Sequence, residues 1–316
     1  MIIGALLLSY ALMVGCTTRL LRRSWVFRAP RLAIVLWQLA LATMVAATML
    51  GLLALGMPTV PGSGLAEIVH ACFQALRDVY RSPTSERLLF LLAFGLTAAL
   101  IARIGGCLIT ELWRAARHRR RHLRALTLLG RADSQLGVTI LDHARPAAYC
   151  VPGRGRRIVL TSATLAALDA DQLAQVLRHE RAHLAGRHDL ILVSASALAQ
   201  AIPLPVFSTA ARELGTLVEM LADDAARTPQ QRITLAAALV AIATGEPITP
   251  ASVLAAAATA VLARVTRLVQ PTHRLPRTAT VAAAVCGGLV ALAPVVIVLA
   301  PVVVSAVMHY CPVSEA

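Results

Sequence analysis

The chain has 316 residues, of which 58% are hydrophobic and only 15% are charged. Soluble domains contain about 25% charged residues, so these figures exclude a disordered chain, a disulfide scaffold and an ordinary cytosolic enzyme. The 30 basic residues are all arginine and outnumber the 16 acidic residues, which gives a net charge of +14. The composition therefore predicts an integral membrane protein with several spans and one modest soluble domain.

Four apolar stretches are long enough to cross the hydrocarbon core as helices, which takes about 20 residues. They cover residues 2–18, 32–57, 88–108 and 278–308. Arg103 lies near one end of the third, where its long side chain can reach the interface, and Pro294 and Pro301 interrupt the fourth. The pattern therefore predicts four transmembrane helices.

Arginines flank these spans on one side. They gather at residues 19–31, 114–131 and 264–277, whereas the loop at 58–87 carries acidic and basic residues in balance. Because arginine favours the cytoplasmic side, we expect an inner-membrane protein with its N-terminus outside and residues 113–277 in the cytoplasm. The alternative is a nucleic-acid surface, but the regular flanking favours contact with anionic membrane lipid and no direct contact with nucleic acid.

Three domains are predicted: a three-span membrane region at 1–112, a cytoplasmic domain at 113–277, and a last span with a short external tail at 278–316. Within the outer loop at 58–87, apolar residues recur at helical spacing from 65 to 80. This spacing predicts a short helix on the outer membrane surface, which serves as a sensing element or only as a connector.

The cytoplasmic segment begins with strand patterns and continues as helix. Residues 138–141, 147–151 and 157–161 are short apolar runs separated by turn residues, which is typical of strands. Asp169 and Gln172 form a capping box before a helix predicted from 170 to about 186.

That helix contains the sequence His179-Glu180-Arg181-Ala182-His183. Residues four apart share one helix face, so the two imidazoles can bind one cation, while Glu180 can hold and deprotonate the attacking water. Zinc would lower the pKa of that water to about 7. The alternative is a helix with two exposed histidines.

A catalytic zinc needs a third protein ligand, and Glu219, in a second alanine-rich helix, would complete the set. Asp223 lies one turn further and can hydrogen-bond a ligand imidazole, although it could instead belong to a solvated acid pair. His188 and Asp189 either support the ligands in the same way or form a solvated helix end.

The apolar stretch at 190–207 separates the two halves of this site. If His183 and Glu219 bind one ion, both ends of the stretch lie on the same membrane face. We therefore expect it to dip into the membrane and return at Pro203 and Pro205, or to lie along the inner leaflet.

These motifs resemble the BlaR/MecR antirepressors, a membrane metallopeptidase family of gluzincin type with four spans. The matching segments are residues 158–189 around the His-Glu-x-x-His motif, Glu219-Met-Leu-Ala-Asp-Asp-Ala225, which has Ala222 where cysteine is usual, and Arg264-Val-Thr-Arg-Leu268. The resemblance implies an α-helical integral membrane protein with a cytoplasmic α+β zincin-like metallopeptidase domain. It also implies zinc ligands His179, His183 and Glu219, with Glu180 as general base.

The chain departs from that family at its end, because it stops a few residues after Met308. The external penicillin-binding sensor domain of the antirepressors is therefore expected to be absent, and sensing by acylation with it. A signal would enter through the outer loop, the spans or a partner protein.

The leading hypothesis is a membrane-bound zinc endopeptidase that cleaves a winged-helix transcriptional repressor or itself. The alternatives are quality control of membrane proteins, as in HtpX-like peptidases, and a non-catalytic signalling scaffold that keeps zinc structurally. Tyr149 and His143 are weak candidates for stabilising the oxyanion, and an edge strand at 157–161 is expected to bind substrate by strand addition. The sequence does not indicate the oligomeric state.

Overall fold

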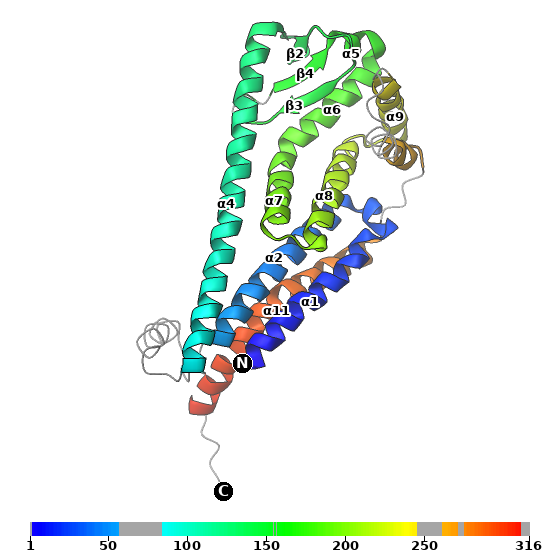
Figure 1. Ribbon diagram of the computed structural model, residues 1–316. Coiled ribbons are helices and arrows are strands. Elements are labelled where there is room, and N and C mark those ends of the chain that lie inside the picture. The colour runs from blue at the N-terminus through cyan, green and yellow to red at the C-terminus, as the bar shows by residue number, and fades with distance from the viewer. Residues whose placement is uncertain are drawn as a thin grey trace. The chain divides into compact units, whose positions relative to one another are not determined.

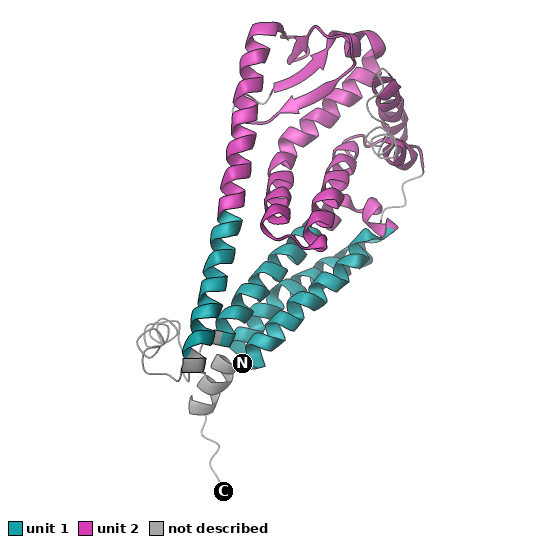
Figure 2. Ribbon diagram, in the orientation of Figure 1, with its two compact units in different colours: residues 1–23, 35–105, 276–316 teal, residues 24–34, 106–275 magenta. Residues whose placement is uncertain are grey.

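The computed structural model describes residues 2–56, 84–153, 155, 157–244, 261–270 and 275–310. It forms two compact units, coloured separately in Figure 2. Unit 1 contains residues 1–23, 35–105 and 276–316, and unit 2 contains residues 24–34 and 106–275. The helix predicted over 65–80 lies outside the described residues.

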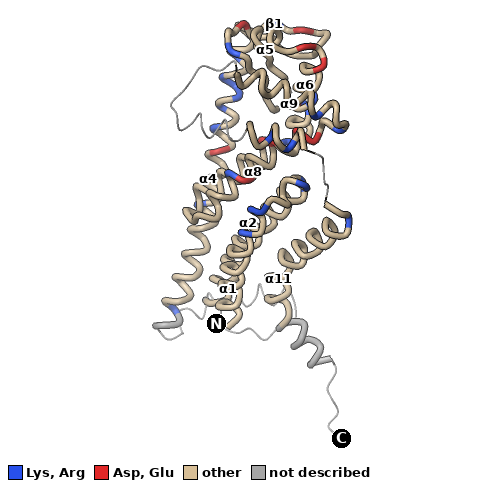
Figure 3. The backbone as a smooth tube through the Cα atoms, turned by 90° about the vertical axis from the view of Figure 1, so that its right-hand side faces the viewer, with Lys and Arg blue, Asp and Glu red and all other residues tan. Residues whose placement is uncertain are grey.

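Unit 1 is built from long apolar helices (Figure 1): α1 (Ile2–Thr17), most of α2 (Pro30–Gly56), the first part of α4 (Thr84–Leu129) and α11 (Arg277–Tyr310). Four segments of the described residues are long and apolar enough to cross a membrane, judged by length and composition, and the first of them, Ile2–Arg22, extends beyond the end of α1. In Figure 3 charged residues are sparse along α1 and α11. The predicted membrane sidedness stays a prediction.

The helices of unit 1 contact one another through a hydrogen bond as well as by apolar packing. The Tyr10 hydroxyl on α1 donates a hydrogen bond of 2.6 Å to the carbonyl of Val290 on α11. Trp37 on α2 is fully buried. Two short 3-10 helices, η1 (Thr18–Arg22) and η2 (Ser24–Arg28), connect α1 to α2.

Unit 2 contains a four-stranded sheet of β1 (Gly130–Asp133), β2 (Val138–Leu141), β3 (Ala148–Val151) and β4 (Arg157–Thr161). The strand order is β1-β2-β4-β3, with β2 and β4 parallel and the other two pairs antiparallel. The three predicted strands are present. β1 was not predicted, because its sequence, Gly-Arg-Ala-Asp, has no apolar alternation.

Alternation along the strands gives the sheet two apolar faces. Ile158 and Leu160 on β4 pack with Leu177 of α6 (Ala170–Gly186), whereas Val159 between them packs with Leu126 of α4. The sheet is therefore covered by α6 on one face and by the end of α4 on the other.

Unit 2 continues as a series of helices. These are α5 (Ser162–Ala167), α6, α7 (His188–Ala201), α8 (Pro205–Asp223) and α9 (Pro229–Thr244), and residues 261–269 are also helical. The apolar stretch at 190–207 forms most of α7 and the start of α8, which pack against each other. The chain reverses between them where the two prolines were predicted to return it, and the relation of this reversal to a membrane stays a prediction.

The expectation that residues 157–161 form an edge strand is wrong. β4 pairs with β2 on one side and with β3 on the other, so its backbone groups are already bonded on both sides. The edge strand beside α6 is β3, which pairs on one side only in the described sheet.

The start of α6 is fixed by a capping box. The Asp169 side chain accepts a hydrogen bond of 2.8 Å from the backbone N–H of Gln172, whose side chain accepts one from the N–H of Asp169. Loss of such a cap costs about 1 kcal/mol. We therefore expect Asp169→Ala to lower the midpoint of thermal unfolding by about 2–4 °C, measured by circular dichroism in detergent. Asp171→Ala, in the same turn but outside the box, is the matched control, and equal midpoints for Asp169→Ala and the unmodified chain would contradict the prediction.

Candidate metal centre

Helix α6 presents two imidazoles side by side. His179 and His183 are one turn apart, and their Nε2 atoms lie 3.1 Å from each other. His179 is buried and His183 is half-buried. Both rings therefore direct a nitrogen toward the same point.

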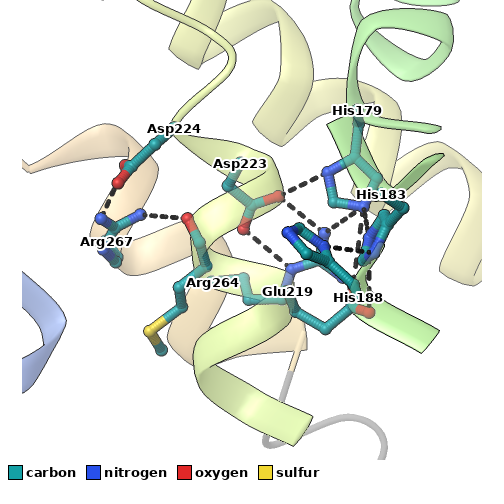
Figure 4. Close-up of polar contacts among 9 residues, drawn as sticks. His179, His183, His188, Glu219, Asp223, Asp224, Arg264 and Arg267 are labelled. Atoms are coloured by element: carbon teal, nitrogen blue, oxygen red, sulfur yellow. Dashed lines mark hydrogen bonds and ion pairs between the residues drawn. The ribbon is translucent and has the colours of Figure 1, made fainter. Parts of the chain in front are cut away.

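Helix α8 adds a carboxylate from the other side (Figure 4). Glu219 Oε2 lies 3.5 Å from Nε2 of His179, and Oε1 lies 3.6 Å from Nε2 of His183. One potential ligand atom from each of the three residues falls within 4.8 Å of the other two. Glu219 reaches this position because buried side chains of α8, such as Phe207 and Leu217, anchor the helix in the core.

Each imidazole is also held through its other ring nitrogen. Asp223 is fully buried, and its Oδ1 lies 3.1 Å from Nδ1 of His179. His188, the first residue of α7, places its Nδ1 3.0 Å from Nδ1 of His183. Such partners fix the ring orientation and the tautomer of a metal-ligating histidine.

The turn between α6 and α7 brings His188 to that position. Arg187 adopts a left-handed conformation with φ of 48°, which ends α6 and begins α7. The His188 ring then lies over Gly186, where a Cβ would collide with it. A side chain at position 186 would therefore push the His188 ring away from its position beside His183.

These contacts lie within one recognised segment of the chain. Residues 112–268 match the family model of Peptidase family M48. The match supports a metallopeptidase and covers both site helices together with the helical residues 261–268. Searches of curated proteins and of solved structures found no match. The resemblance to the BlaR/MecR antirepressors stays a prediction.

The three grouped side chains fit zinc, the metal on which M48 peptidases depend. Two imidazole nitrogens and one carboxylate oxygen are the ligands of catalytic zinc sites, which keep a fourth position open. Burial lowers the pKa of His183 to about 4, so this imidazole is neutral and able to bind a cation at neutral pH. Burial alone would lower the pKa of His179 as well, but Asp223 and Glu219 raise it to about 9 without a metal. A metal ion bound at this site would therefore have to displace a proton from His179.

Glu180, between the two histidines of the motif, is buried. This burial raises the pKa of its carboxyl group above the ordinary value, against the opposing charge of His179 and a hydrogen bond from Cys150. Burial and the nearby Glu180 raise the pKa of the Cys150 thiol to about 12, so the thiol stays protonated. Sequence reasoning missed Cys150, although alternation along β3 directs it toward α6.

Sequence reasoning also missed the contacts of two arginines, of which Arg264 belongs to the centre and Arg267 lies outside it. Arg264 forms an ion pair of 3.0 Å with Glu219, and its Nη2 lies 2.7 Å from Asp223 Oδ1 and 3.4 Å from Nε2 of His179. Arg267, one turn further, pairs with Asp224 at 2.7 Å. The sequence match at Arg264-Val-Thr-Arg-Leu268 was the available signal, but nothing in it indicated the carboxylates of α8 as partners.

Other candidates do not join the centre. The Tyr149 hydroxyl lies 2.8 Å from Nε2 of His122 on α4, and the ring packs with Leu126 on the face of the sheet away from α6. His143 accepts a hydrogen bond at Nδ1 from the N–H of Arg145. Both residues therefore have structural partners of their own, and neither contacts the histidines of α6 in the described contacts.

Proposed function

We propose that this chain is a membrane-bound zinc endopeptidase with its active site on the cytoplasmic face of the inner membrane. The observation that carries the proposal is the convergence of His179, His183 and Glu219 from two helices, with buried Glu180 next to them. The match to Peptidase family M48 supports the same chemistry.

The proposed reaction is hydrolysis of a peptide bond. Zinc held by the two imidazoles and Glu219 would polarise the scissile carbonyl and lower the pKa of water. Glu180 accepts a proton from the attacking water while the oxygen of that water bonds to the carbonyl carbon. The same carboxyl group then gives that proton to the departing amine nitrogen as the carbon–nitrogen bond breaks.

Substrate binding is proposed at β3 in place of β4. The free edge of β3 can form main-chain hydrogen bonds with an extended peptide, and such pairing does not depend on the peptide's side chains. Because Cys150 of β3 contacts Glu180, a peptide on this edge would run close to the general base.

The membrane location rests on the apolar helices and on the arginines of α4. Cζ of the Arg117 guanidinium lies over the Trp113 ring, 5.1 Å from the ring centre. The same helix face continues with Arg120, Arg121 and Arg124. Tryptophan and arginine are typical of the membrane interface. We propose that this face contacts anionic lipid headgroups.

For the substrate, we propose a winged-helix transcriptional repressor or the chain itself, which the resemblance to the antirepressors supports. The test is reconstitution of the full chain in liposomes with Zn²⁺ and a repressor encoded in the neighbouring gene. We expect discrete fragments by gel and mass spectrometry, loss of cleavage with a zinc chelator, and recovery when Zn²⁺ is restored. Unchanged cleavage in the chelator would reject the zinc mechanism. Cleavage of many unfolded membrane proteins, with the repressor left intact, would favour the HtpX-like role.

A further inference from the structure

Arg264 makes an unusually complete set of contacts with the two acidic residues on the site face of α8. Its Nε lies 2.9 Å from Asp223 Oδ2 and its Nη2 lies 2.7 Å from Oδ1, which is the two-pronged geometry that matches a guanidinium to a carboxylate. Its remaining nitrogen, Nη1, lies 3.0 Å from Glu219 Oε2. One side chain thus uses three nitrogens to hold two carboxylates (Figure 4).

Both carboxylates act on the imidazole pair. The Asp223 oxygen held by Nη2 is the one that lies 3.1 Å from Nδ1 of His179. On Glu219, Arg264 binds Oε2, and the other oxygen, Oε1, lies 3.6 Å from Nε2 of His183. The orientation of each carboxylate toward the histidines is therefore tied to the position of a single guanidinium.

The two carboxylates, Glu219 and Asp223, need a positively charged partner. Glu219 and Asp223 are four residues apart on one helix face, where two negative charges repel each other. Asp223 has no exposed side-chain surface and the Arg264 side chain has only 13%. A buried carboxylate without a counter-charge is strongly unfavourable, and the guanidinium supplies the counter-charge that buried Asp223 needs.

We propose that Arg264 is a positioning residue of the metal centre, which sets the orientation of the ligand Glu219 and, through Asp223, that of the ligand His179. The proposal rests on the proposed function, because it takes His179, His183 and Glu219 as zinc ligands. Arg264 itself binds no metal in it.

The test measures metal binding by the full chain in detergent, after removal of metal with a chelator. Zn²⁺ affinity is obtained by competition with a chromophoric chelator, and Co²⁺ titration gives a visible spectrum that reports the ligand geometry. Loss of residues that hold metal ligands in place usually weakens metal affinity 10–100-fold. We expect a loss of about that size for Arg264→Ala, together with an altered Co²⁺ spectrum.

Two further variants separate positioning from simple stabilisation. Arg264→Lys keeps the charge and a long side chain but cannot form the two-pronged contact, so we expect a smaller loss of affinity than for Arg264→Ala. Arg267→Ala is the matched control, because Arg267 has a similarly buried side chain and binds Asp224, yet it contacts neither Glu219 nor Asp223 in the described contacts. We expect its Zn²⁺ affinity and Co²⁺ spectrum to remain those of the unmodified chain.

Two results would overturn the proposal. Nη2 of Arg264 lies 3.4 Å from Nε2 of His179, so the guanidinium could instead oppose a cation there. Zn²⁺ affinity in Arg264→Ala or Arg264→Lys equal to or above that of the unmodified chain would reject positioning, and a rise in Arg264→Ala, which removes the charge, would show this opposition. An equal loss in Arg267→Ala would reduce Arg264 to general stabilisation. Either result leaves the proposed function intact if the unmodified chain binds one zinc, whereas failure of that chain to bind zinc rejects both.

Discussion

Glu180→Gln is expected to abolish proteolysis while leaving zinc in place. The substitution keeps the size of the side chain but removes the group that accepts the proton of the attacking water and returns it to the leaving amine. General acid–base groups contribute about 10²–10⁴-fold to rate, so cleavage should fall by a factor in that range. Zinc content per chain, measured by atomic emission after gel filtration, should remain that of the unmodified enzyme, because Glu180 is not among the three grouped ligand candidates.

A matched control exists on α8. Glu213→Gln makes the same chemical change outside the group of ligand candidates, and it should affect neither cleavage nor zinc content. If Glu180→Gln kept normal signalling, and if neither this variant nor the unmodified chain cleaved a substrate, the chain would be a zinc-stabilised scaffold. Retention of cleavage would remove Glu180 from the mechanism.

Glu219→Gln is expected to remove zinc as well as activity. An amide oxygen is neutral and a weaker zinc ligand than a carboxylate, and the change also breaks the ion pair with Arg264. The loss of Zn²⁺ affinity should exceed the 10–100-fold loss that is typical when a residue contacts a metal ligand but not the metal itself. Chelator competition, followed by metal analysis of the purified protein, measures this directly.

The zinc content of the two inactive variants distinguishes the roles of the two glutamates. Glu180→Gln should give a zinc-loaded inactive protein, and Glu219→Gln a zinc-depleted inactive one. If Glu219→Gln retained one tightly bound zinc per chain, Glu219 would not be the third ligand, and another acidic residue of α8 would have to be tested in its place.

Local sequence signals predicted the part of the site that lies on one helix. The capping box at Asp169 fixes the start of α6, and the four-residue spacing then sets His179 and His183 on one face whatever surrounds the helix. Glu219 required a further argument, from the ligand count of a catalytic zinc. The structure brings its carboxylate to the imidazoles, as that argument required.

Contacts between distant segments were not predictable in this way. Arg264 follows Asp223 by 41 residues, and arginines before a span are ordinarily explained by membrane topology. Nothing in the sequence separates an arginine that pairs with a buried carboxylate from one that faces lipid. The edge-strand error has a similar origin, because the apolar pattern of residues 157–161 shows burial but does not show which neighbours pair with the strand.

Within unit 2, Arg267 links the end of α8 to the connector η2. Its guanidinium donates to the carbonyl of Met220 on α8 and, at 2.8 Å, to the carbonyl of Phe27 in η2, the short connector that leads from α1 to α2. Met220 is the residue directly after Glu219. The Arg267 side chain thus joins two segments that lie 240 residues apart in the sequence, so local opening of η2 and fraying of the C-terminal end of α8 are expected to be coupled.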